Sequence, residues 1–272
     1  MHTIRPPAVA GSFYPAQATA LASTVASLLA AARAEPPQPD RPAPKVLIVP
    51  HAGYIYSGPM AAHAYAQLAG VRHAIRRVVL LGPTHRVPVR GLALPGVSAF
   101  ATPLGEIAID AEAVAALRTL RQVVVSAAAH ALEHSLEVQL PFLQSVLDDF
   151  RLLPLAVGDA EPHEVAEVLE ALWGGPETLI VISSDLSHFL PYAAARQIDG
   201  QTVEHILALD ATLTHAQACG GTPINGLLLA ARRRHLQPQL LGVCNSGDTA
   251  GDRQRVVGYA AFTFTEPVHV SH

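Results

Sequence analysis

The chain has 272 residues, half of them hydrophobic and only 15% charged, so it can bury a sizeable core. A net charge of −4 and a pI near 6.4 exclude the strongly basic surface typical of nucleic-acid binding. Two cysteines in this length make no disulfide framework, which favours a reducing compartment. No signal peptide or bilayer-spanning apolar run is recognisable, so we expect a cytoplasmic protein without membrane contact.

The first third of the chain predicts two buried strands that each lead to a histidine. Its expected elements are a helix over 16–33, a proline-rich loop over 36–44, a strand over 46–49, a helix over 60–68 and a strand over 77–81. His51 follows the first strand directly after a proline, and His85 follows the second after a Gly-Pro break. Strand ends of this kind are where open α/β sheets bind their ligands.

The middle of the chain predicts shorter strands and three helices. These are strands over 91–95, within 100–109, over 123–126 and over 152–157, and helices over 111–120, 131–149 and 162–173. The carboxylate of Asp110 can cap the first of these helices. Pro141 lies inside the second, so we expect a kink or a break there.

The last third predicts a third strand that ends in polar residues. The expected elements are a strand over 178–183, helices over 193–209 and 225–234, and strands over 239–243 and 256–265. Asp185 and His188 follow the first of these strands, and Cys244 follows the strand over 239–243. The final strand alternates as an edge or antiparallel strand does.

The alternation of strands and helices predicts an α/β fold. We expect a single domain over 1–272, with the loop at 36–44 inside it. Its sheet should be mostly parallel or mixed and covered by helices on both faces.

The strand ends bring a set of metal-binding groups to one edge of this sheet. Because adjacent strands lie about 4.8 Å apart, His51, His85, Asp185 with His188, and Cys244 can converge on one pocket. Two imidazoles with a thiolate or a carboxylate form a three-ligand set suited to zinc, iron or copper. Three ligands leave positions open for a substrate, as in catalytic sites.

Other residues are assigned to the pocket or have structural alternatives. The further pocket residues are Tyr54, Glu133, His134, Asn245 and Asp248. Glu133 and His134, with Glu137, could equally form an electrostatic cluster at a helix start, and Asp185 could cap a helix start near His188. Asn245–Asp248 is interpreted as a glycine-built turn. Cys219 is interpreted as a small buried hydrophobic residue rather than a nucleophile.

Several long motifs run in order along nearly the whole chain. They are Arg5–Pro15, Pro50–Gly58, Gly82–His85, Glu133–Glu137, Ser183–His188, Cys219–Gly220 with Pro223–Ile224, and Asn245–Asp248 with Val257–Ala261. In this order they resemble the Memo family, the B component of the AmmeMemoRadiSam set.

The resemblance implies a fold like that of the class III extradiol dioxygenases, which are non-haem iron enzymes that open catechol rings. In those enzymes two histidines and a glutamate hold the iron. The Memo pattern keeps both histidines, here His51 and His85, and some members have a cysteine as third ligand, a place that Cys244 takes here. His188 corresponds to the acid/base histidine, with Asp185 beside the metal and setting the pKa of His188.

The leading hypothesis is therefore a metal-dependent redox protein that binds iron(II) or, alternatively, copper or zinc. Its substrate would be a small molecule or a peptide. A second hypothesis is a non-catalytic binding module for a peptide or for a partner protein. The family name implies radical-SAM and AMMECR-type proteins as such partners. A metal-dependent hydrolase is the third hypothesis.

Overall fold

The computed structural model describes residues 3–32 and 43–267. The strands are β1 (Ile4–Arg5), β2 (Pro44–Val49), β3 (Arg77–Pro83), β4 (Leu92–Leu94), β5 (Ala99–Thr102), β6 (Gly105–Ala108), β7 (Val123–Val125), β8 (Arg151–Val157), β9 (Thr178–Ser183), β10 (His188–Leu190), β11 (Gln237–Asn245) and β12 (Val256–Thr265). The helices are α1 (Ala18–Ala32), α2 (Tyr54–Ala66), α3 (Ala111–Ala116), α4 (Ala127–Ala131), α5 (Leu140–Val146), α6 (Pro162–Ala171), α7 (Tyr192–Leu207) and α8 (Gly221–Arg233), with 3-10 turns η1 (Glu137–Gln139) and η2 (Ser246–Asp248).

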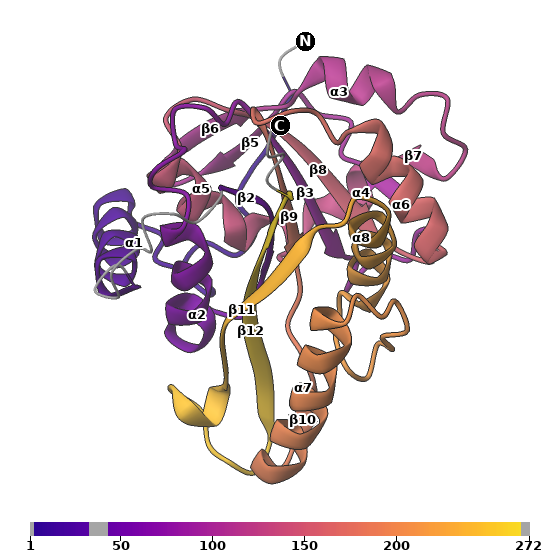
Figure 1. The fold of residues 1–272 in the computed structure, drawn as a ribbon. Helices are drawn as coiled ribbons and strands as arrows, with labels where there is room; N and C mark the ends of the chain where they lie inside the picture. Colours follow the sequence, from indigo (N-terminus) through magenta and orange to yellow (C-terminus); the bar gives the residue numbers. More distant parts are fainter. Residues whose placement is uncertain (1–2, 33–42, 268–272) are drawn as a thin grey trace.

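A mixed sheet of nine strands forms the centre of the described part of the molecule (Figure 1). Its order is β10-β12-β2-β9-β3-β8-β4-β7, and β11 also pairs with β12. The neighbours β2, β9, β3 and β8 are parallel, whereas β12 runs antiparallel to β2, β10 and β11. Strands β1, β5 and β6 form a separate small sheet. Because β2 and β3 both flank β9, their carboxyl ends lie close together.

The central strands are apolar throughout because both of their faces are covered. In β2, Leu47 and Val49 point to a core shared with α1, α2 and α5, while Val46 and Ile48 point to a second core shared with α6 and α8. Figure 1 shows these two groups of helices on opposite sides of the sheet. The alternation follows from the two-residue period of a strand. The predicted α/β fold with a mixed sheet covered on both faces is confirmed.

The predicted helix over 131–149 is wrong in its first half. Helix α4 ends at Ala131 and α5 starts only at Leu140. Between them, the Ser135 hydroxyl donates to the carbonyl oxygen of Pro83, and Glu133 accepts the amide of His85. These contacts with the end of β3 hold the segment in an irregular path. Pro141 lies in the first turn of α5, where its missing N–H costs little.

Two other helices begin earlier than predicted. Helix α2 starts at Tyr54, because the Gly53 carbonyl already accepts the amides of Tyr56 and Ser57. Helix α8 starts at Gly221 rather than at residue 225. The earlier start of α2 places the helix directly after the His51 turn.

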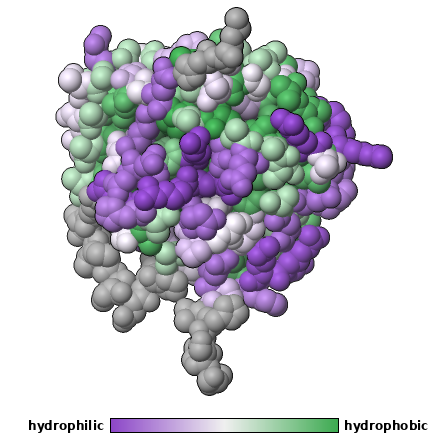
Figure 2. Space-filling model, turned by 90° about the horizontal axis from the view of Figure 1, so that it is seen from above, coloured by the Kyte–Doolittle hydropathy of each residue, from purple (hydrophilic) through white to green (hydrophobic). Residues whose placement is uncertain are grey.

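Parts of the predictions fall outside the described residues. The predicted loop at 36–44 does so up to residue 42, and the prediction of one domain over 1–272 stays a prediction. In the part of the chain that the structure describes, no helix is long and apolar enough to cross a membrane. Hydrophilic and hydrophobic residues are interspersed over the face seen in Figure 2.

Candidate metal centre

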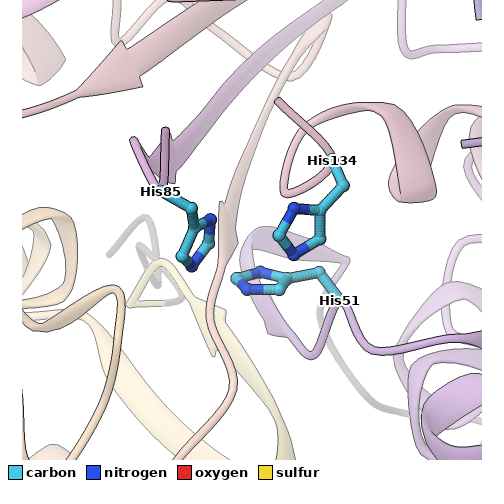
Figure 3. A group of neighbouring side chains, drawn as sticks. All are labelled: His51, His85 and His134. Carbon is cyan, nitrogen blue, oxygen red and sulfur yellow. The ribbon is translucent and has the colours of Figure 1, made fainter. Parts of the chain in front are cut away.

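Three histidines meet above the carboxyl ends of the central strands (Figure 3). One ring nitrogen from each of His51, His85 and His134 lies within 4.8 Å of the others. The rings of His85 and His134 are stacked with centroids 4.6 Å apart, and both stand edge-on to the His51 ring. Small rotations would let three such nitrogens reach one ion at the usual bond length of about 2.1 Å.

His51 is held in one tautomer by a chain of hydrogen bonds. The Ser183 hydroxyl donates to the Ser135 carbonyl oxygen at 2.6 Å, so it can only accept from His51 Nδ1 at 2.9 Å. The proton of the buried His51 ring is therefore on Nδ1, and Nε2 is the acceptor, with the Cys219 sulfur 3.3 Å from it. Burial, together with the charges of His134 and His85, also lowers the pKa of His51 well below its ordinary value. The ring is neutral, as a metal ligand must be.

His85 is oriented by the buried carboxylate of Glu133. Glu133 accepts from His85 Nδ1 at 2.8 Å and from the His85 backbone amide at 2.6 Å. Burial alone would raise the pKa of Glu133, but these bonds and the Ser135 amide outweigh it and hold the pKa at about 2. A carboxylate on Nδ1 leaves Nε2 of His85 to face a ligand.

His134 is positioned by the N-terminal segment, residues 3–14. The Arg5 side chain donates to the carbonyl oxygens of His130 and Glu133, on the loop that leads to His134. The Phe13 ring lies 4.7 Å from the His134 ring. Burial lowers the pKa of His134 to about 4, although the Glu133 charge opposes this. The third imidazole is thus neutral at physiological pH as well.

Glu137 anchors this N-terminal segment. Its fully buried carboxylate pairs with Arg5 and accepts the amides of Ala8 and Val9 and the hydroxyl of Tyr14. Glu137 was expected in the pocket or in a helix-start cluster, and it instead ties two distant parts of the chain together.

His188 and Cys219 face the histidine cluster from the other side. Nδ1 of His188 donates to the Leu186 carbonyl oxygen at 2.8 Å, which leaves Nε2 as an acceptor. Burial lowers the pKa of His188. The Cys219 sulfur lies 3.3 Å from Nε2 of His51, and burial raises the pKa of this thiol to about 12. Both residues line a cavity of about 890 Å³ that opens beside His85.

Asp185 has a different partner from the one predicted. It was expected to set the pKa of His188, but its carboxylate accepts the backbone amide of His51 at 2.7 Å. Burial raises the pKa of Asp185 to about 7, although the amides of His51 and Ala52 oppose the rise. Asp185 therefore fixes the turn that carries His51.

Cys244 is not one of the described residues whose donor atoms meet in this cluster. It lies in β11 opposite Tyr259 of β12 and packs against the hydrophobic core. In its place the structure brings His134 to the two predicted histidines and sets Cys219 beside them. Burial raises the pKa of the Cys244 thiol to about 11. The ligand role of Cys244 stays a prediction that this arrangement does not support.

The remaining predicted pocket residues lie behind or away from the cluster. The Tyr54 hydroxyl donates to the Val138 carbonyl oxygen inside the core. Asn245 and Asp248 cap η2 reciprocally, and Asp248 also accepts the hydroxyl of Tyr192. None of the three is among the described residues that line the cavity. The interpretation of 245–248 as a turn agrees with this geometry.

Sequence reasoning undervalued Cys219 and gave His134 only a general pocket role. His134 does not follow a strand, so a search for strand-end histidines misses it. The Cys219-Gly220 pair precedes α8, and a Cβ at Gly220 would lie 2.6 Å from the Ser184 side chain. That close approach, which only glycine permits, brings Cys219 to the end of β9. The signal in the sequence that could have found Cys219 was a cysteine followed by a glycine directly before a helix.

Comparisons with known proteins place this arrangement in a family. The family model described as Memo-like protein matches residues 5–263. The chain belongs to the Memo-like family. Proteins described as MEMO1 family proteins include those of Sulfolobus acidocaldarius (33% identical, 96% of this chain and 99% of the relative), Ignicoccus hospitalis (36%, 97% and 99%) and Methanopyrus kandleri (36%, 96% and 98%). An uncharacterized Escherichia coli K12 protein of known structure is 14% identical, with a TM-score of 0.48 over 79% of this chain and 98% of that one.

The donor set of this Memo-like chain fits a metal ion. Three imidazoles converge, and in two of them a fixed partner holds the proton on Nδ1. Partners of this kind are what metal-binding histidines use to present a lone pair. The sulfur of Cys219 adds a further donor near His51. A possible metal site of three histidines is thus a property of this Memo-like structure.

The Glu133 carboxylate should make the protein sensitive to acid. Its pKa of about 2 in the folded chain is below the ordinary value of 4.5, so its contribution is present at neutral pH. The contribution is lost as pH falls from about 4.5 towards about 2, and a shift of this size corresponds to about 3 kcal/mol. Denaturant unfolding of metal-free protein, measured in steps from about pH 6 to about pH 3, should show about 2 kcal/mol of this loss. Glu133→Gln should flatten the pH dependence, while Glu204→Gln on the exposed face of α7 should not.

Proposed function

We propose that this Memo-like protein is a metal-dependent redox protein that binds iron(II) through His51, His85 and His134. The observation that supports the proposal most is the convergence of three imidazoles, in two of which a fixed partner holds the proton on Nδ1 and leaves Nε2 as the acceptor. The ring of His51 is buried, while the side chain of His85 is 28% exposed, at the edge of the cavity. A bound ion would therefore have protein on one side and the cavity on the other.

A bound iron ion would supply Lewis acidity and one-electron chemistry at the cavity wall. The chain's own residues have separate tasks. Glu133 and Ser183 orient the ligand rings, and Nε2 of His188 can accept a proton from a molecule in the cavity. Burial keeps His188 neutral, which is the form that accepts the proton.

The donor set favours a transition metal but leaves more than one element in competition. Imidazole nitrogen suits iron, copper and zinc alike, whereas magnesium and calcium prefer oxygen. A sulfur at Cys219, close to His51, adds a soft donor that copper and iron accept. Iron(II) is our first choice because the resemblance of the sequence motifs to the Memo family implies a fold like that of non-haem iron enzymes.

Elemental analysis of protein purified anaerobically without chelator tests the proposal. We expect about one iron per chain, removed by chelation and restored by added iron(II). Copper in the same amount would support a redox protein that uses copper instead of iron. Zinc alone, with no redox activity, would favour a hydrolase instead. A folded protein that binds none of these metals would overturn the proposal and favour a non-catalytic binding module for a peptide or a partner such as a radical-SAM protein.

A further inference from the structure

The cavity beside His85 lies at the carboxyl ends of the central strands β3 and β8, next to the edge strand β10. It is formed by the segment after β3, the end of β8, residues 188–190, α7 and the loop before α8. Its volume of about 890 Å³ is within the range of pockets for small molecules, about 300–1,000 Å³. The walls carry a group of apolar side chains: Val87, Pro88, Val157, Leu190, Ile198 and Ala216. At one end lie His85 and Cys219, next to the candidate metal centre.

Arg86 gives this cavity a positive charge without a partner. It lines the cavity, and no hydrogen bond or ion pair joins its guanidinium to another described residue. Arg90, four residues later, is by contrast held by both carboxylate oxygens of Glu164. Burial and the charge of His85 lower the pKa of His134, and the Arg86 charge adds to this, while the Glu133 charge opposes it. The guanidinium is therefore near the histidine cluster and available to a ligand.

The acidic groups nearby do not neutralise Arg86. Asp159 is an acidic residue of the cavity lining, and its charge acts on Arg90. Glu133 is engaged with His85. An apolar wall disfavours sugars and nucleotides, because most of their hydroxyl groups would lose their hydrogen bonds there. A guanidinium favours a planar carboxylate, which can accept two parallel hydrogen bonds.

We propose that the cavity binds a small organic carboxylate with an apolar body, its carboxylate on Arg86 and its body against the apolar wall. His85 and Cys219 line the same cavity, so part of that body would lie beside the metal centre. That the ligand is a substrate rests on the proposed function. Binding itself does not, because Arg86 and the apolar wall belong to the chain with or without a metal.

Calorimetric titration with a matched pair of probes tests the proposal. Phenylbutyrate carries the carboxylate, and phenylbutanol has a similar apolar body without the charge. We expect the native, metal-loaded protein to bind phenylbutyrate about tenfold more tightly, as a charge-assisted hydrogen bond provides. Arg86→Gln should abolish that preference while leaving phenylbutanol binding unchanged. Arg233→Gln is the control, since this arginine lies in the last turn of α8, outside the cavity lining.

Three results would overturn the proposal: no binding of either probe, equal binding of both, or an acid preference that survives Arg86→Gln. The last would mean that another group, such as the metal, holds the carboxylate. Repeating the titration on chelated protein separates the two proposals. An Arg86-dependent preference in a protein that proves to bind no metal would support the cavity and contradict the metal centre. A metal-loaded protein without the preference would support the metal centre and contradict the proposed carboxylate site in the cavity.

Discussion

Glu137→Gln is expected to lower the free energy of unfolding by about 3–5 kcal/mol, the cost of breaking a buried ion pair by removing one partner. Arg5 is 4% exposed and Glu137 is completely buried. The substitution removes the negative charge beside Arg5 and places an amide group among donors. At least one of the amides of Ala8 and Val9 or the Tyr14 hydroxyl then loses its acceptor. Urea unfolding of the metal-free protein measures the change.

A second effect follows from where the N-terminal segment is attached. It contacts the His134 loop through Arg5, and its Phe13 carbonyl oxygen accepts the amide of Tyr54, just after the His51 turn. Glu137→Gln should therefore also weaken metal binding. Glu164→Gln, which breaks the exposed pair with Arg90, is the matched control and should change both quantities far less. Equal losses of stability in the two variants would contradict the account of the N-terminal segment.

His85→Ala should reduce metal affinity by more than the about 10- to 100-fold that loss of a ligand's supporting partner typically costs. His85 supplies one of three imidazoles, and its side chain is partly exposed, so the fold should tolerate the change. Competition with a metal-binding dye measures the affinity, and circular dichroism confirms folding. Glu133→Gln leaves all three rings in place, so its metal affinity should fall by only about 10- to 100-fold.

The control for this experiment is His63→Ala, which removes an imidazole in the last turn of α2, outside the cluster. It should bind metal as the native chain does. If His85→Ala kept native affinity, or if His63→Ala lost as much, the cluster would not be the metal site.

Much of the fold could be predicted because the central strands are apolar on both faces. The runs at 46–49, 77–81 and 178–183 are each long enough, and bounded clearly enough, to indicate buried strands of a parallel sheet. Their carboxyl ends then located His51 and His85. The helix over 131–149 could not be predicted correctly, because contacts of Glu133 and Ser135 with residues about 50 positions earlier decide its path.

The third donor was the hardest part of the site to predict. Cys219 and Cys244 both precede polar or glycine-rich segments, and their positions depend on how the chain folds back after β9. His134 is placed by Arg5 and Phe13, more than 100 residues away in sequence. Such long-range packing leaves no periodic signal. Local sequence patterns could therefore predict two of the candidate ligands, whereas the third could be identified only from the tertiary structure.

Anomalous X-ray scattering from crystals grown anaerobically, of protein purified without chelator, tests the metal centre most directly. The proposed function predicts a single strong peak, at the iron edge, about 2.0–2.2 Å from ring nitrogens of His51, His85 and His134. The same map shows whether the sulfur of Cys219 joins them. Well-ordered histidines without a peak between them, or a metal bound by Cys244 instead of His134, would contradict the centre described here.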